Sequence, residues 1–158
     1  MKKILILLSA FSFSIAGTVY MGYDFNGDTD NVTLGYNHIF KTWVCEETGN
    51  PSWILVGGAN YDVSLTDDLG FAGVYALPMK PVSEKMAVWA SFGYSVTVGD
   101  ASDTVDGGLT YGLGLHYYLN ETLGMGVGMV NHDWETELLG ITVEDTLEKM
   151  NLYFSYRF

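Results

Sequence analysis

Apolar side chains recur at every second position in one segment of this chain after another. In the closing stretch NLYFSYRF, Leu152, Phe154, Tyr156 and Phe158 alternate with mostly polar neighbours. Successive side chains of an extended strand point to opposite faces, whereas the apolar stripe of a helix follows a period near 3.6. The sequence therefore predicts strands with one apolar face, and no long stretch has a convincing helical period.

Eight such segments are separated by clusters of turn-forming residues. The predicted strands cover roughly residues 19–25, 32–40, 55–65, 69–77, 86–98, 109–119, 123–129 and 151–158. In the fourth of them, the apolar outer face is assigned to Leu69, Phe71, Tyr75 and Leu77. Residues 78–85 contain two prolines and are expected to form a turn. The acidic segment 131–148 is expected to be a long loop.

The second face of the strands distinguishes a membrane barrel from a soluble one. In the fifth to seventh strands it carries small or uncharged side chains: Ala87, Trp89, Ser91, Gly93, Ser95, Thr97, Thr110, Gly112, Gly114, His116, Tyr118, Gly124, Gly126 and Gly128. A surface in water would carry Lys and Glu, yet charged residues make up 16% of the chain, against about 25% in soluble domains. Such a set suits the crowded inside of a narrow barrel, and closure leaves no unpaired strand edge in lipid. We predict an all-β, eight-stranded antiparallel up-and-down transmembrane β-barrel.

The first residues have the pattern of a secretory signal peptide. Lys2 and Lys3 precede an apolar run, and Ser14 and Ala16 are small residues at the usual −3 and −1 positions. Cleavage is expected after residue 16, which leaves residues 17–158 as one domain of 158 − 16 = 142 residues. Its formal charge is 5 − 19 = −14, which argues against nucleic acid as a partner. Cys45 is the only cysteine, so an internal disulfide is excluded.

Charge is distributed unevenly between the two predicted ends of the barrel. If the first strand starts on the periplasmic side, the odd-numbered connections lie outside the cell. These connections carry Asp28, Asp30, Asp67, Asp68, Asp100, Asp103, Asp106, Asp133, Glu135, Glu137, Glu144, Asp145 and Glu148. The other end has balanced charges: Lys41, Lys80, Lys85 and Arg157 against Glu46, Glu47, Glu84 and Glu121. An interfacial aromatic girdle is expected near this balanced end, from Trp43, Trp53, Tyr117 and Tyr156.

The signal peptide, the eight short strands and the final strand with Phe154, Tyr156 and the terminal Phe158 resemble small bacterial outer-membrane β-barrels of the OmpX/OmpA type. The resemblance covers the whole mature chain, through architecture and end motif rather than long identical segments. It implies location in the outer membrane of a Gram-negative cell envelope, contact with outer-membrane lipids and lipopolysaccharide, and a monomer. It also implies that the barrel assembly machinery recognises the final strand through Leu152, Phe154, Tyr156 and Phe158.

Some barrels of this size modify lipid A, which makes the three histidines candidate catalytic bases. A hydrolase needs a nucleophile beside a base and an orienting acid. His116 has no Ser or Cys two residues away, and the His-x-Ser pattern of barrel lipid A deacylases is absent. His38 shares a face with aromatic neighbours, and His132 begins an acidic stretch. No catalytic residue is assigned.

Metal binding has weaker signals. Asn26, Asp28 and Asp30 have the spacing of the start of a calcium loop, but the required Gly and distal Glu are missing. Asp100, Asp103 and Asp106 recur at every third position. No metal site and no cofactor site is assigned, although divalent cations could bridge acidic loops to lipid phosphates.

The interior is expected to be packed rather than open. Inward glycines face Trp89, Tyr118 and Tyr153, and large side chains against glycines fill a narrow barrel. The inward ionisable residues should be paired or hydrated at the ends: Asp24, Asp62, Lys149 and Arg157. The leading hypothesis is a non-enzymatic outer-membrane barrel whose acidic extracellular loops have a structural or surface-interaction role. The alternatives are a narrow, cation-preferring, porin-like channel and a lipid A-modifying enzyme.

Overall fold

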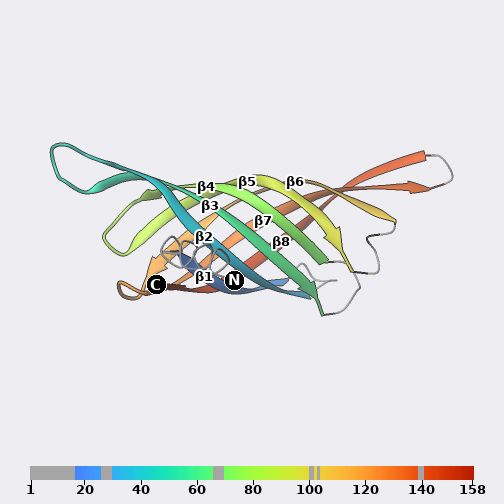
Figure 1. Cartoon of the computed structure of the whole chain (residues 1–158), viewed down its shortest axis with the longest axis horizontal. Helices are drawn as coiled ribbons and strands as arrows, with labels where there is room; N and C mark the ends of the chain where they lie inside the picture. The colour runs from blue at the N-terminus through green and yellow to red at the C-terminus, as the bar shows by residue number, and fades with distance from the viewer. Residues whose placement is uncertain (1–16, 26–29, 66–69, 100–101, 103, 139–140) are drawn as a thin grey trace, which may run out of the picture.

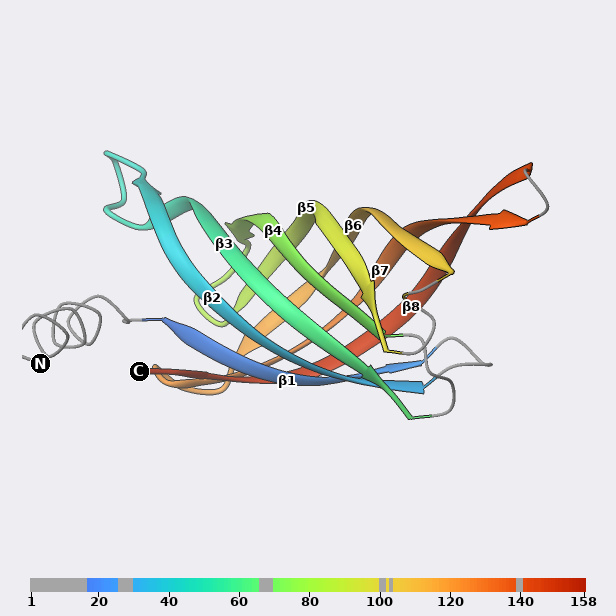
Figure 2. The same cartoon turned by 45° about the vertical axis from the view of Figure 1, so that its right-hand side comes forward.

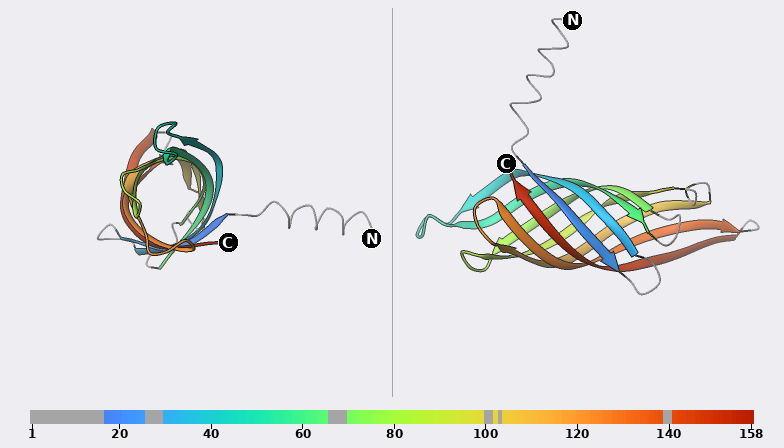
Figure 3. Two further views of the ribbon diagram at one scale, coloured as in Figure 1. Left: turned by 90° about the vertical axis from the view of Figure 1, so that its left-hand side faces the viewer. Right: turned by 90° about the horizontal axis from the view of Figure 1, so that it is seen from below.

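The computed structural model describes residues 17–25, 30–65, 70–99, 102, 104–138 and 141–158, so the predicted signal peptide lies outside the described residues. Every strand pairs antiparallel with the next, and the first pairs with the last, which closes the barrel (Figures 1 and 3). The strands are β1 (Thr18–Phe25), β2 (Asp30–Val44), β3 (Pro51–Ser64), β4 (Gly70–Pro81), β5 (Met86–Val98), β6 (Val105–Tyr118), β7 (Leu123–Leu138) and β8 (Ile141–Arg157). The predicted fold class is confirmed.

Within the described ranges, no helix has both the length and the apolar character that a membrane crossing requires.

The closing stretch of the sequence is held on both sides. Strand β8 pairs with β1 from Thr18↔Arg157 to Phe25↔Met150, and with β7 along its whole length. The Phe158 amide donates a hydrogen bond to the Gly17 carbonyl at 3.1 Å. The C-terminus therefore does not fray, because its strand completes the barrel.

The outer surface of the barrel is apolar. Its exposed side chains include Met21, Leu34, Phe92, Leu113 and Phe154, which come from five different strands. On the same strands, the alternate positions are buried and small or polar, as Ala87, Ser95 and Thr110 show. This division matches the predicted lipid-facing and inward-facing sets in β1 and β5–β8.

The predicted facing of β4 is wrong. Phe71 is 0% exposed and points inward, as do Tyr75 and Leu77, which line the interior. Ala72 and Val74 lie on the outer side, where Val74 is 63% exposed. Both faces of this strand are apolar, so alternation gave no polar set to mark the interior. Pairing of Ala72 with Val96 of β5 fixes the facing instead.

Two predicted connections are shorter than expected. The ladder between β4 and β5 has a gap opposite Leu77 and Pro78 but resumes at Met79, so the turn comprises only residues 82–85. The acidic segment 131–148 is mostly strand, because β7 and β8 stay paired from Asn131↔Glu148 to Leu138↔Ile141. Pairing of β1 with β8 ends at Phe25↔Met150, so this hairpin extends past β1 at the end of the barrel opposite the C-terminus (Figure 2).

Candidate functional site

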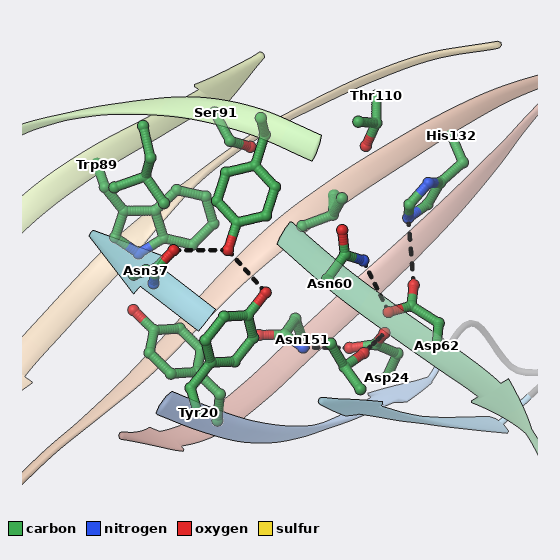
Figure 4. A pocket seen from close by; sticks show the side chains of 15 residues that line it. Tyr20, Asp24, Asn37, Asn60, Asp62, Trp89, Ser91, Thr110, His132 and Asn151 are labelled. Atoms are coloured by element: carbon green, nitrogen blue, oxygen red, sulfur yellow. Dashed lines mark hydrogen bonds and ion pairs between the residues drawn. The ribbon is translucent and has the colours of Figure 1, made fainter. Parts of the chain in front are cut away.

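A buried ionic cluster occupies the acidic half of the barrel interior. The Lys149 ammonium lies 3.4 Å from Asp62 Oδ2, and His132 Nε2 lies 3.7 Å from the same oxygen. Asn60 Nδ2 donates a hydrogen bond to Asp62 Oδ1 at 2.8 Å (Figure 4). Strands β3, β7 and β8 thus place opposite charges and an amide at one level, where burial makes pairing necessary.

Aromatic and amide groups complete the surroundings of the buried ammonium. Lys149 Nζ lies 4.6 Å from the Phe71 ring centroid, and Phe71 stacks on His132 with centroids 4.6 Å apart. With the Asn31 amide oxygen turned toward it, Lys149 Nζ donates a hydrogen bond of 2.8 Å. Phe71 points inward and belongs to this cluster, although its sequence pattern predicted a position on the lipid-facing side.

Asp24 is the second interior carboxylate. Thr33 Oγ1 donates to Asp24 Oδ2 at 2.5 Å, and Asn151 Nδ2 donates to Asp24 Oδ1. The prediction that inward ionisable groups are paired is confirmed for Asp62 and Lys149, whereas Asp24 is hydrogen-bonded to two neutral side chains. Arg157 is exposed at the end of the barrel that carries the C-terminus.

A layer of tyrosines and a tryptophan fills the other half. The Tyr20 and Tyr75 hydroxyls lie 2.9 Å apart, and Tyr75 donates to Asn37 Oδ1 at 2.7 Å. The Trp89 ring lies over Gly128, where a Cβ would come within 2.3 Å of its Cζ2 atom. The predicted packing of large side chains against inward glycines is thus confirmed.

A cavity of about 80 Å³ remains between the ionic cluster and this aromatic layer. Its walls include Asp24, Asp62, Tyr75, Trp89 and His132. Its walls combine polar side chains of the ionic cluster with rings of the aromatic layer.

Three interior side chains have the residue types of a hydrolase triad. Ser95 Oγ lies 3.2 Å from His132 Nδ1, and Asp62 lies on the opposite side of the same imidazole. Their exposed fractions are 0% for Ser95, 2% for His132 and 1% for Asp62. All three side chains are therefore enclosed within the barrel.

Sequence reasoning did not bring these three residues together. They come from β5, β7 and β3, far apart in the chain. The alternation of the sequence placed Ser95 and Asp62 on the inner face. Only barrel closure and strand register bring them to the same level along the barrel axis. His132 lay inside the segment predicted to be a loop.

The four residues of the predicted assembly signal lie on the outer surface. Leu152, Phe154, Tyr156 and Phe158 are all exposed, and they form one outward row on β8 and its end. His38 lies outside the interior cluster, with its ring 5.4 Å from that of Phe40.

In the part of the chain that the structure describes, no three His, Cys, Asp or Glu side chains are grouped to hold a metal ion. Asn26, Asp28, Asp100 and Asp103 lie outside the described residues.

Neither protein-family models nor curated protein sequences match the chain. Solved structures do. The outer membrane enzyme PagL superposes with a TM-score of 0.59 at 14% identity, covering 89% of this chain and 99% of that one. A de novo designed transmembrane β-barrel gives 0.55 at 17% identity, covering 90% and 96%. The Yersinia pestis outer membrane protein Ail gives 0.51 at 15% identity, covering 90% and 98%.

The chain therefore has the fold of the small eight-stranded outer-membrane β-barrels, as its sequence resemblance implied. These neighbours include both an enzyme and a designed barrel, so the fold leaves the activity open.

Deletion of Phe158 is expected to reduce assembly in cells more than the stability of a finished barrel. The deletion removes one exposed side chain, a loss of at most roughly 1.5–3 kcal/mol by burial in lipid, and leaves the pairing of Thr18 with Arg157 in place. Membrane-inserted protein in cells should fall while refolding in detergent stays nearly normal. Normal insertion in cells would show that the final strand carries no assembly signal, and failed refolding would make Phe158 chiefly a packing residue.

Proposed function

We propose that this protein is a non-enzymatic barrel of the bacterial outer membrane that engages a partner at the cell surface. The partner would bind the acidic hairpin, defined here as residues 131–148 of β7 and β8. The apolar outer face and the fold shared with outer-membrane barrels support this location. The hairpin itself supports the surface role.

The observation that carries the proposal is the length and charge of the acidic hairpin. It extends past β1 at the end of the barrel opposite the C-terminus (Figure 2). It contains no Lys or Arg and six acidic residues: Asp133, Glu135, Glu137, Glu144, Asp145 and Glu148. A paired hairpin holds these carboxylates on a defined frame, which favours a basic protein surface or cation-bridged lipopolysaccharide as the partner.

The packing of the barrel interior favours this surface role over an enzymatic or a channel function. The candidate nucleophile Ser95 is 0% exposed, and its hydroxyl lies against His132 inside the barrel. Paired charges and the Trp89 layer fill the space on both sides of the small cavity. Mass spectrometry of lipid A from an overexpressing strain and single-channel conductance of refolded protein are the corresponding assays. Modified lipid A would show an enzymatic function, and a conductance step would show a channel. Either result would contradict the proposed surface role.

The role of the hairpin is tested by removing three of its six negative charges while keeping its backbone pairing. In the triple variant Glu135→Gln, Glu137→Gln and Glu144→Gln, we expect capture of surface partners from intact cells or envelope fractions to fall at least tenfold. Glu46→Gln, Glu47→Gln and Glu84→Gln remove the same charge at the opposite end and should leave capture unchanged. Equal capture by both triple variants and wild type would exclude the acidic hairpin as the binding surface.

The proposed location in the outer membrane is tested separately. The protein is expected in the outer-membrane fraction, with different gel mobility before and after heating, because a closed barrel resists unfolding in detergent at room temperature. Both readouts use the unmodified chain. Recovery as a soluble periplasmic monomer would overturn the membrane location.

A further inference from the structure

The β2–β3 hairpin is unusually long for the end of the barrel at which it lies. Pairing of β1 with β2 stops at Thr18↔Asn37, and pairing of β3 with β4 stops at Ile54↔Met79. Strands β2 and β3 nevertheless stay paired to Val44↔Pro51. The hairpin therefore projects beyond its neighbours at the end with the C-terminus (Figures 1 and 3). Outer-membrane barrels usually have short turns at that end, as at residues 82–85 here.

The outer face of this hairpin carries a pair of tryptophans. Trp43 and Trp53 are Cα partners across the two strands, and both indoles are exposed. A bulge between Ile39 and Lys41 inserts Phe40, whose ring covers Gly57 on the same face and is 69% exposed. Exposed amphipathic rings of this kind suit the boundary between lipid tails and headgroups.

Two ammonium groups lie against this tryptophan pair. Lys41 Nζ is 4.9 Å from the Trp43 ring centroid, and Lys80 Nζ, on β4, is 5.6 Å from the Trp53 centroid. Both lysines are exposed, and neither forms an ion pair with a carboxylate in the described ranges. Attraction to a ring positions an ammonium while leaving its N–H donors free for an anion.

We propose that Lys41, Lys80, Trp43 and Trp53 form a binding site for the headgroup of an anionic phospholipid in the leaflet at the periplasmic end. The phosphodiester would accept hydrogen bonds from the two ammonium groups, and the glycerol and upper acyl carbons would pack on the rings. Membrane lipid is favoured over soluble phosphate because the site faces outward beside the exposed Phe40 ring. This site lies at the end opposite the acidic hairpin and does not depend on the proposed surface role.

Nearby carboxylates do not cancel this positive charge at the level of the rings. Glu46 and Glu47 follow the end of β2 in the turn, beyond Trp43 and toward the tip of the hairpin. Glu84 lies in the turn after β4, beyond Lys80. On the β2–β3 hairpin and on β4, the ammonium groups therefore lie at the level of the rings, and the carboxylates follow farther along the chain in the turns.

The site is tested with the mature protein refolded into phosphatidylcholine vesicles. Tryptophan quenching is compared between brominated phosphatidylglycerol and brominated phosphatidylcholine at equal mole fraction. About 1 kcal/mol per lysine near a membrane surface predicts roughly thirtyfold preferential binding of phosphatidylglycerol by wild type when both ammonium groups contribute, and about fivefold when one does. In Lys41→Gln/Lys80→Gln the preference should fall to near one, while Lys41→Arg/Lys80→Arg should keep most of it. All four tryptophans are present in every variant, but only Trp43 and Trp53 have a substituted lysine against their rings, so the differences report on this pair.

Lys85→Gln is the matched control, since it removes an exposed charge at the same end with no aromatic ring against it in the described structure. Heat-modifiable gel mobility confirms that each variant is folded. The proposal is overturned if wild type shows no preference, or if Lys85→Gln lowers the preference as much as the double variant. Displacement of brominated phosphatidylglycerol by soluble glycerol phosphate would show a site for dissolved phosphate, and would overturn the assignment to membrane lipid.

Discussion

Replacement of Lys149 by Met is expected to lower the free energy of unfolding of the barrel by roughly 3–5 kcal/mol. Lys149 is 2% exposed and lies 3.4 Å from Asp62, which is itself 1% exposed. Met keeps most of the length of the side chain but not its charge. The Asp62 carboxylate is then left buried without its cation, which is the main source of the loss. Urea unfolding of protein refolded in lipid vesicles, followed by tryptophan fluorescence, measures the effect.

A double variant separates charge from packing. Lys149→Met combined with Asp62→Asn removes both charges, so it should be less destabilised than Lys149→Met alone. Asn at position 62 can still accept the hydrogen bond from Asn60. A loss below about 1 kcal/mol for Lys149→Met would be typical of an exposed ion pair and would show that water screens the interior.

Ala90→Arg is expected to destabilise the barrel by roughly 2–4 kcal/mol, the range for a charged side chain on the lipid face near the bilayer centre. Ala90 is exposed and lies near the middle of β5, on the same face as the exposed Phe92. The added guanidinium would have to leave water for hydrocarbon. Unfolding of the variant in lipid vesicles, compared with wild type, gives the difference.

The adjacent residue is the matched control, because it points to the other side of the sheet. Ser91 lines the interior cavity, so Ser91→Ala should lose no more than about 1 kcal/mol, the worth of a modest hydrogen bond. If both substitutions had the same effect on unfolding, the assignment of inner and outer faces on β5 would be wrong.

Facing could be predicted where the two faces of a strand differ in chemistry. In β5, Val88 and Phe92 alternate with Trp89 and Ser91, and one face has the small or uncharged residues of a barrel interior. In β4, apolar residues such as Phe71 and Val74 lie on both faces, and the same reasoning failed. Period alone identifies an extended strand but cannot orient one that is apolar on both sides.

The predicted strand boundaries were wrong where the local composition suggested a loop. Six acidic residues and no basic residue made 131–148 resemble a solvated connection, yet Asn131↔Glu148 to Leu138↔Ile141 are paired. Thr, Val and Ile in this segment favour strand, and the partner strand supplies the backbone hydrogen bonds that stabilise it. Whether these residues have a partner strand depends on the register of β7 with β8, which cannot be predicted from the local sequence.

The sequence by itself determined the extended backbone, the number of strands, the closed antiparallel barrel and the segregation of acidic residues to one end. These follow from local period, turn chemistry and the requirement that hydrocarbon leave no strand edge unpaired. Only the tertiary structure decided which side chains meet inside. Asp62, His132 and Lys149 come from three strands, and the Trp43–Trp53 pair depends on the register of β2 with β3. Such contacts depend on closure and register, which are properties of the whole sheet.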